Sequence, residues 1–358
     1  MVYYIRFLKP PKLQHGKNGL ATASALISIT TDLGDAFLAE DVSLQAQLIA
    51  GDTNTVLQKK DLLWQAGKRE LPVSIGPIRF GLKNQPIGLA IGIKDASSSV
   101  FHDELNDSTT LPLVMSGWSA SFGGSESATA AKLVERRFNL EEHGQLRIWE
   151  ETGNNIARHI WDAALAAVIC LQSAITNSPS SELQKLQSRF QHGTNKTLRV
   201  VELGAGCGIV GIALAQMQPR SAVILTDLPE VNDIVSRNMR LAHLAAGSSV
   251  EFQVLDWDEP HGDVFADGLD LILVSDCTYN ADSLPALVLV LSHATRRSPD
   301  ALVLVSLKRR HDSEAVFFEL MQAASFRIVE QTAVSLPAAY SEADRIEIYG
   351  FQHVHTHT

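Results

Sequence analysis

The stretch "VVELGAGCGIVGI" (residues 200–212) places Gly204, Gly206 and Gly208 between an apolar run and a run with helical spacing. Glycines that follow a strand let the chain turn sharply and let ligand atoms approach the backbone. The helix expected from about Ile209 would point free N–H groups and the positive end of its dipole toward the same space. The stretch therefore predicts a strand, a glycine-rich turn and a helix that face an anionic group of a ligand.

Two ligands fit such a turn. Read from Gly206, the sequence is G-C-G-I-V-G, the dinucleotide fingerprint in which the helix N-terminus binds a pyrophosphate. Read from Glu202, it is E-L-G-A-G-C-G, as in the loop that binds the carboxylate of S-adenosylmethionine (SAM) in methyltransferases. A glycine pattern alone does not choose between them, because any tight strand-to-helix turn would need the same residues.

Acidic residues at the ends of the next two strand-like runs indicate a nucleoside ligand. Asp227 ends the run "AVILTD", where a carboxylate can accept both ribose hydroxyls, although an ordinary helix cap would also suit it. Asp256 and Trp257 end the run "QVLDW", and they offer an acceptor for the edge of an adenine and a flat ring for its face. An acidic turn with a packed tryptophan is the structural alternative. These residues support an adenosine group without choosing the cofactor.

Asp276 and Tyr279 follow the fourth strand-like run, in "DLILVSDCTYN" (residues 270–280). In a doubly wound sheet the carboxyl ends of the central strands face the ligand crevice. An acid and a phenol at that edge are therefore placed for chemistry on a substrate nitrogen. A helix cap at Asp276 and a packed ring at Tyr279 are the structural alternatives.

The hydrophobic pattern of the 358-residue chain changes near residue 145. Within residues 1–145, apolar and polar residues alternate over several short runs, such as residues 22–30, 42–48 and 87–93. A period of two predicts half-buried strands. We therefore expect a smaller, mainly-β N-terminal domain, folded as an antiparallel sandwich or a barrel-like sheet.

From residue 146 to residue 358, short apolar strands alternate with helix-like stretches. A helix is expected from about residue 154 to residue 172, with Asn154 or Asn155 as its N-cap, and a polar insertion with a short surface helix follows it. The parallel strands are expected near residues 198–203, 222–226, 250–255, 269–275 and 301–307. This order predicts a doubly wound, mostly parallel α/β sheet.

The last two strand-like runs, residues 326–334 and 345–354, are separated by a segment too short for a crossover helix. Because parallel neighbours need a crossover, this terminal pair should be antiparallel. The sheet would then have seven strands, with five in a parallel wind closed by a hairpin. That order differs from the usual nicotinamide-binding domain, so it favours SAM and leaves an NAD dehydrogenase as the weaker alternative.

Residues 146–352 resemble the family 16 seven-strand protein-lysine methyltransferases, which include the enzymes that modify valosin-containing protein, Hsp70 chaperones and translation elongation factors. The matching segments are ETGNNIARHIWDAALAA, VVELGAGCGIVGI, TDLPEV, LDW, SDCTYN and KRRHDSEAVFFELM. Most members are small single domains, whereas this chain carries about 145 further residues ahead of the motif tryptophan. Larger fungal-type members have similar extensions.

The resemblance implies SAM as the cofactor and a position for each motif residue. Asp276 and Tyr279 stand in the D-x-x-Y motif that closes the methyl-transfer pocket, and they are the candidate catalytic residues. Trp161 is implied to line the cofactor site, and Trp257 to contact the adenine. The full set of candidate cofactor-binding residues is Trp161, Glu202, Gly204, Gly206, Gly208, Asp227, Leu228, Asp256 and Trp257.

The implied activity is N-methylation of a lysine in a folded intracellular protein, such as a translation factor or a chaperone. A lysine side chain titrates near 10.4 in water, so the site must both orient the ammonium and remove its proton. We expect Asp276 to bind the ammonium and Tyr279 to offer a ring face or a hydroxyl for alignment. The turn lacks a D/N-P-P-Y motif, which disfavours adenine N6 and glutamine amides as acceptors. A small-molecule methyltransferase and a non-catalytic SAM-fold scaffold are the alternatives.

Composition restricts the partners. With 45% apolar and 20% charged residues and no run of eighteen apolar residues, the chain is expected to be soluble and to contact no membrane. A formal net charge of −10 makes nucleic acid an unexpected partner. We expect a monomer whose partner is its substrate protein. The N-terminal run lacks the order of a signal peptide, so the expected location is the cytoplasm, with the nucleus second and mitochondria disfavoured.

Three smaller features receive plain interpretations. The three cysteines, Cys170, Cys207 and Cys277, have no C-x-x-C spacing and are expected to be buried, reduced thiols. The basic run "KRRH" (residues 308–311) is expected to form a solvated rim. The C-terminal "HVHTHT" (residues 353–358) is expected to be a frayed tail, and no metal site is predicted.

Overall fold

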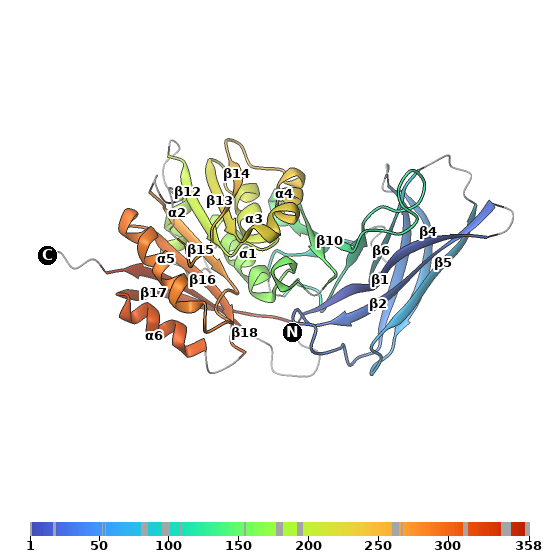
Figure 1. Cartoon of the computed structure of the whole chain (residues 1–358), viewed down its shortest axis with the longest axis horizontal. Coiled ribbons are helices and arrows are strands. Elements are labelled where there is room, and N and C mark those ends of the chain that lie inside the picture. Colours follow the sequence, from blue (N-terminus) through green and yellow to red (C-terminus); the bar gives the residue numbers. More distant parts are fainter. Residues whose placement is uncertain are drawn as a thin grey trace.

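The computed structural model places a β-rich part beside an α/β part, as Figure 1 shows from blue to red along the chain. It describes residues 2–16, 19–51, 53, 55–79, 85–94, 101–107, 109–153, 155–176, 182–191, 196–259, 265, 268–310, 314–337 and 345–354. The features predicted at Asn154, His355 and His357 lie outside these residues. Among the helices of the described residues, none has the length and apolar character needed to cross a membrane.

The β-rich part consists of two sheets that share one buried apolar cluster, as predicted for a sandwich. The first sheet has the order β5-β2-β1-β8, with β1 (Tyr3–His15), β2 (Leu20–Thr30), β5 (Leu71–Arg79) and β8 (Val114–Met115). The second has the order β11-β10-β9-β6-β3-β4, with β3 (Val42–Ala50), β4 (Val56–Trp64), β6 (Ile87–Ile93), β9 (Gly117–Ser119), β10 (Leu133–Leu140) and β11 (Gly144–Glu151); β7 (Asp103–Glu104) pairs with β10. Strand β11 crosses the boundary predicted after residue 145 and forms the edge of this sheet.

The α/β part contains the predicted seven-stranded sheet, in the order β14-β13-β12-β15-β16-β18-β17. Its strands are β12 (Leu198–Leu203), β13 (Ser221–Asp227), β14 (Ser249–Val254), β15 (Leu271–Ser275), β16 (Leu302–Lys308), β17 (Phe326–Ser335) and β18 (Arg345–His353). Strands β12 to β16 pair in parallel, and β18 is antiparallel to both β16 and β17. The terminal hairpin inferred from the missing crossover is therefore confirmed.

Helices cover both faces of this sheet. They are α1 (Asp162–Ile175), α2 (Gln184–Phe190), α3 (Ile209–Met217), α4 (Asn232–Leu241), α5 (Leu284–Arg297) and α6 (Ala315–Ala323), with 3-10 turns η2 (Glu141–His143), η3 (Ile156–Arg158) and η4 (Pro229–Val231). Alternate residues of a strand point to opposite faces, so Leu273 packs with α1 and α3 whereas Val274 packs with α5 and α6. The first of these two cores is continuous with the core of the β-rich part.

The helix predicted from residue 154 begins later than expected. Asn155 does act as a cap, but of the short turn η3, where its side chain accepts the N–H of Ala157 at 3.1 Å. The chain is then extended through His159 and Trp161, and α1 begins only at Asp162. The prediction failed because apolar spacing cannot register that residues 159–162 bond to the β-rich part instead of to a preceding helical turn.

Strand β11 joins the two parts of the molecule. Its outer edge is covered by Asn238 of α4, which accepts the N–H of Trp149 at 2.8 Å and donates to the carbonyl oxygens of Trp149 and Cys207 at 2.9 Å each. The Asn238 side chain is completely buried and satisfies the edge of β11 as a further strand would. The guanidinium of Arg237 stacks on the Trp149 ring at 4.4 Å. The β-rich part is thus hydrogen-bonded and packed against the α/β part.

We expect Asn238→Ala to lower the free energy of unfolding by about 2 kcal/mol or more, because it leaves buried backbone groups of β11 without partners. Asn232→Ala on the same helix is the matched control, since its exposed side chain bonds only to Ser236 among the contacts described, and we expect a change within about 0.5 kcal/mol. Urea unfolding of both variants measures the difference. Equal stabilities would show that β11 is not held by this side chain.

Candidate functional site

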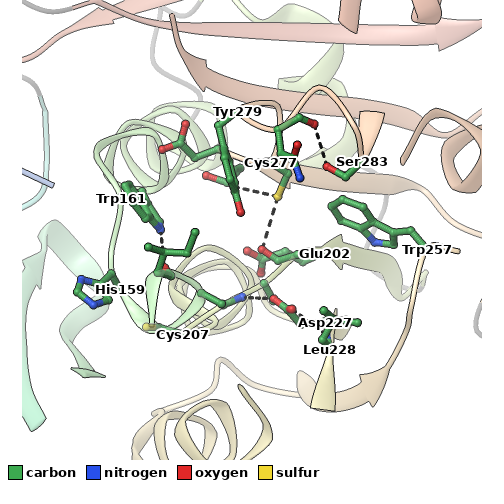
Figure 2. A pocket seen from close by; sticks show the side chains of 18 of the residues that line it. His159, Trp161, Glu202, Cys207, Asp227, Leu228, Trp257, Cys277, Tyr279 and Ser283 are labelled. Atoms are coloured by element: carbon green, nitrogen blue, oxygen red, sulfur yellow. Dashed lines mark hydrogen bonds between the residues drawn. The ribbon is translucent and has the colours of Figure 1, made fainter. Parts of the chain in front are cut away.

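A cavity of about 430 Å³ opens at the carboxyl ends of β12, β13, β14 and β15. This is the edge at which doubly wound sheets bind ligands. Ten of the eleven predicted site residues line it, and Figure 2 shows several of them around it: Trp161, Glu202, Gly204, Gly206, Asp227, Leu228, Asp256, Trp257, Asp276 and Tyr279. Gly208 does not belong to this lining. The strand-end reasoning therefore located the cavity from sequence.

The three glycines of the turn all have a positive φ, but each is required by a different neighbour. A Cβ at Gly204 would lie 2.5 Å from the sulfur of Cys277, and one at Gly206 would lie 2.8 Å from the carbonyl oxygen of Ala157. Gly208 caps α3 in the left-handed conformation, and a Cβ there would meet Val235 at 2.9 Å. Close packing of the protein on itself, at Cys277 and η3, thus accounts for residues that the sequence pattern attributed to the ligand.

Asp227 ends β13 and fixes the glycine turn. Its carboxylate accepts the N–H of Gly206 at 2.7 Å and the N–H of Leu228 at 2.7 Å, one on each oxygen. Burial raises the pKa of Asp227, and the two hydrogen bonds oppose that rise. Because a carboxylate oxygen has a second lone pair, each oxygen can still accept a hydroxyl from a ligand.

Glu202 is the penultimate residue of β12 and is almost completely buried. Its carboxyl group accepts the N–H of Gly211 at 2.8 Å, and a Cβ at Gly211 would collide with both Glu202 and Leu225. Burial raises the pKa of Glu202 to about 8, although the bond from Gly211 opposes the rise. Glu202 therefore ties helix α3 to β12 and is mostly protonated at neutral pH.

The lining of the cavity is strongly acidic. Six of its residues carry a carboxyl group: Glu202, Asp227, Glu230, Asp256, Asp258 and Asp276. Among the lining residues that the structure describes, none is a lysine or an arginine. Glu202 is mostly protonated and Asp276 is paired with Arg310, so the other four carboxyl groups supply the negative charge that attracts cations and repels phosphates. It suits the positively charged sulfur of SAM and the ammonium of a lysine, and it opposes the pyrophosphate of a dinucleotide.

Two tryptophans border the cavity, as Figure 2 shows, with Trp257 at one side and Trp161 at the other. Trp161 stands just before α1, and its indole N–H donates to the carbonyl oxygen of Ile156 at 3.2 Å. The guanidinium carbon of Arg310 lies 5.5 Å from the centroid of the same ring. The ring is thus held between η3 and an arginine that follows β16.

Asp276 follows β15 with a φ of 54°, a conformation that costs energy for a residue with a side chain. Its N–H bonds to the carbonyl oxygen of Ser306 at 2.9 Å, and its two carboxylate oxygens each accept from Arg310 at 2.8 Å. Burial raises the pKa of Asp276, and the paired Arg310 opposes this. The candidate catalytic acid is therefore one half of a bidentate ion pair, a contact that the sequence interpretation lacked.

Tyr279 lies near the mouth of the cavity and is 54% exposed. Partial burial raises the pKa of its hydroxyl, with the neighbouring Cys277, Asp227 and Asp276 adding to the rise. The phenol therefore keeps its proton at neutral pH. Its ring is accessible to a long side chain that enters from solvent, and the alternative of a core tyrosine is wrong.

The basic run at the end of β16, of which residue 311 lies outside the described residues, is not the solvated rim that the sequence predicted at Lys308 and Arg310. The Lys308 and Arg310 side chains are only 10% and 15% exposed, while that of Arg309 is 50% exposed. Arg310 pairs with Asp276 and also with Asp32, a residue of the β-rich part. Asp32 gave no sequence signal, because it stands in a loop 278 residues before its partner. The cysteines, by contrast, are buried and free as expected.

Comparison with known proteins finds similarity to lysine methyltransferases. A family model described as lysine methyltransferase matches residues 140–324. The UPF0665 family protein C23C4.06c of Schizosaccharomyces pombe is 26% identical over 324 residues, which cover 88% of this chain and 91% of that protein. Protein N-lysine methyltransferase METTL21A of Danio rerio is 30% identical over 212 residues, covering 57% and 82%. Protein-lysine N-methyltransferase EFM6 of Saccharomyces cerevisiae is 27% identical over 167 residues, covering 42% and 65%.

The buried Glu202 gives a testable dependence of stability on pH. Between the ordinary pKa of 4.5 and the folded value of about 8, the folded chain holds a proton that the unfolded chain releases. The free energy of unfolding therefore falls as pH rises through this window. Glutamine cannot ionise and keeps an acceptor for Gly211. We expect the stability of Glu202→Gln relative to wild type to increase by more than about 1 kcal/mol from about pH 5 to about pH 8. Parallel unfolding curves at the two pH values would contradict a buried neutral carboxyl.

Proposed function

Because the chain belongs to the lysine methyltransferase family, we propose that it transfers a methyl group from SAM to the ε-nitrogen of a lysine in another protein. The single observation that carries the proposal is the cavity lined by six carboxyl groups and, among the described lining residues, by no lysine or arginine. Both reactants of such a transfer carry a positive charge at the reacting end. An acidic crevice at the carboxyl edge of a parallel sheet supports their binding together.

The residues of the cavity fit SAM in its adenosine and methionine parts. Asp227, held on the glycine turn, would accept the ribose hydroxyls with its remaining lone pairs. Trp257 would offer a ring face to the adenine, and Asp256 an acceptor at the adenine edge. The turn at Gly204 and Gly206 would let the methionine part approach the backbone. When bound, SAM supplies an electrophilic methyl group on a positively charged sulfur.

The acceptor lysine would enter past Tyr279, whose exposed ring can stabilise a cationic side chain in transit. Asp276 stands at the inner end of this path, fixed by two bonds from Arg310. Each carboxylate oxygen keeps one lone pair, so Asp276 can accept an N–H of the incoming amine and set its direction. Burial raises the pKa of Asp276, which makes this carboxylate a better proton acceptor than an exposed one. The arrangement would mainly orient the amine, and orientation can contribute roughly 7–11 kcal/mol to a transfer between two bound groups.

The activity is tested by incubating the protein with labelled SAM and a lysate of cells that lack its gene, followed by mass spectrometry of the labelled material. We expect a protein band that carries methyl-lysine, and Asp276→Asn should reduce its labelling by at least about tenfold. Asp282→Asn, an exposed acid outside the cavity lining, is the matched control and should label at the wild-type rate. A labelled metabolite would favour a small-molecule methyltransferase, and no label would favour a non-catalytic scaffold.

Cofactor binding is tested separately by calorimetric titration with SAM. Asp227→Ala removes the proposed ribose acceptor and two bonds that hold the glycine turn, so we expect the affinity to fall by about tenfold or more. Asp276→Asn should retain the wild-type affinity for SAM within about threefold, because the proposal assigns Asp276 to the acceptor amine and not to SAM. Unchanged affinity in Asp227→Ala would remove the ribose assignment.

A further inference from the structure

The β-rich part contributes a buried carboxylate to the surroundings of the site. Asp32 stands just after β2 and is 3% exposed. One of its oxygens accepts from Arg310 at 3.0 Å and from the N–H of Asp162, the first residue of α1, at 3.3 Å. The other oxygen accepts the N–H of Leu33 at 2.9 Å and lies 3.8 Å from the ammonium of Lys308. Asp32 thus contacts two segments of the α/β part: the start of α1, and the end of β16 with the residues that follow it.

Arg310 is shared between two carboxylates that come from different parts of the molecule. Its Nη1 donates to Asp276, while its Nη2 donates to Asp276 and to Asp32. A guanidinium has fixed, planar donors, so two partners on one edge define its orientation. With Asp276 alone, the guanidinium can rotate about the axis of the pair. The third bond, to Asp32, opposes this rotation, and the guanidinium carbon lies 5.5 Å from the centroid of the Trp161 ring.

Asp32 is the third carboxyl group of a buried cluster that contains two cations. Asp32, Asp162 and Asp276 share the two cations Lys308 and Arg310. Asp162 is completely buried, and burial together with Asp32 raises its pKa to about 7. Without Asp32, Lys308 and Arg310 keep only Asp276 and the partly protonated Asp162 as carboxyl partners in this cluster.

The segment around Trp161 is also hydrogen-bonded to the β-rich part. Arg6 donates to Nδ1 of His159 at 2.7 Å, and Glu150 accepts the N–H of Ile160 at 2.9 Å. The hydroxyl of Tyr4 donates to Asp162 at 2.8 Å. Each of the residues 159, 160 and 162 around the cavity tryptophan therefore bonds to the β-rich part, and Asp32 adds the contact with Arg310.

We propose that Asp32 is a positioning residue for methyl transfer: it orients Arg310, which in turn fixes Asp276 for the acceptor nitrogen. The inference rests on the proposed function and extends it to the N-terminal part. That part is then a component of the acceptor side of the site, in addition to any role in stability. Asp32 does not line the cavity, so it acts only through Arg310 and the start of α1.

The test compares Asp32→Asn with Asp35→Asn, an exposed acid of the same loop whose side chain bonds to Thr31. Label transfer from SAM into the lysate protein is measured at increasing SAM concentration. We expect Asp32→Asn to lower kcat by about 10- to 100-fold, because a small misplacement of a reacting group has an effect of that size. Its KM for SAM and its calorimetric affinity for SAM should stay at the wild-type value. Asp35→Asn should match wild type in all three quantities.

Arg310→Lys is the second variant, since it keeps the charge but cannot bridge two carboxylates. It should show the same loss of kcat with the same retained SAM affinity. Adding Asp32→Asn to Arg310→Lys should then reduce kcat by less than about threefold more, because both substitutions act through one guanidinium. Wild-type kcat in either single variant, or two losses that multiply, would overturn the proposal. If Asp32→Asn does not fold, a wild-type kcat in Arg310→Lys would still overturn the proposal, because the guanidinium that Asp32 orients would then be dispensable.

Failure of the proposed function is recognised separately. If the wild-type protein labels nothing, crystal structures of wild type and Asp32→Asn carry the test instead. Displacement of Arg310 from Asp276 in the variant would support the positioning role. An unmoved Arg310, with both bonds to Asp276 kept, would overturn it whatever the enzyme modifies.

Discussion

The ion pair between Arg310 and Asp276 is the contact on which the rest of the site depends. Asp276 adopts a left-handed backbone conformation that its side chain disfavours, and the bond to Ser306 and the two bonds from Arg310 hold it there. Strain of this kind persists only where surrounding contacts overdetermine it. Since Arg310 itself is oriented by Asp32, the geometry at the end of β15 depends on the loop after β2. A carboxylate of the β-rich part and one of the α/β part thus bind the same guanidinium.

Buried charges of this number are costly unless they are paired and hydrogen-bonded. The structure meets that condition in two places. Around the cavity, Lys308 and Arg310 face Asp32, Asp162 and Asp276. Within the β-rich part, Arg136 of β10 and Glu150 of β11 form a pair in which both side chains are fully buried, and Arg136 also donates to the carbonyl oxygens of Ile5 and Ser116. Because replacing a buried ion pair with apolar residues is often neutral or stabilising, these pairs are better evidence for fixed positions of their groups than for stability. The contact of Asn238 with Trp149 joins α4 to β11 through neutral hydrogen-bonding groups.

Sequence reasoning reached the fold and the cavity because both follow from local rules. Apolar runs of strand length, the glycine turn and the missing crossover before the last strand were sufficient for the seven-stranded sheet, and parallel strands necessarily gather their ends at one edge. The failures share one cause. The late start of α1, the burial of Lys308 and Arg310 and the part played by Asp32 depend on contacts between segments more than a hundred residues apart, such as Tyr4 with Asp162 and Asp32 with Arg310, which no periodicity records. The motifs of a family of mostly single-domain enzymes also predict nothing about the β-rich part, where Asp32 and Arg6 lie.

The charge of the cavity lining distinguishes SAM from a dinucleotide better than the glycine turn does. The glycine turn suits a pyrophosphate or a methionine carboxylate equally, and the structure shows that Gly204 and Gly206 are already required by Cys277 and Ala157. Their presence therefore says little about the ligand. The charge of the lining says more, because six carboxyl groups without a described lysine or arginine would repel a dinucleotide at its most charged point. Burial raises the pKa of Glu202, Asp227 and Asp276 within that lining, so the arrival of a cationic ligand would favour their ionised forms. The same electrostatic potential that selects a sulfonium donor also draws in an amine, and the clamp on Asp276 then provides the direction that attraction alone does not.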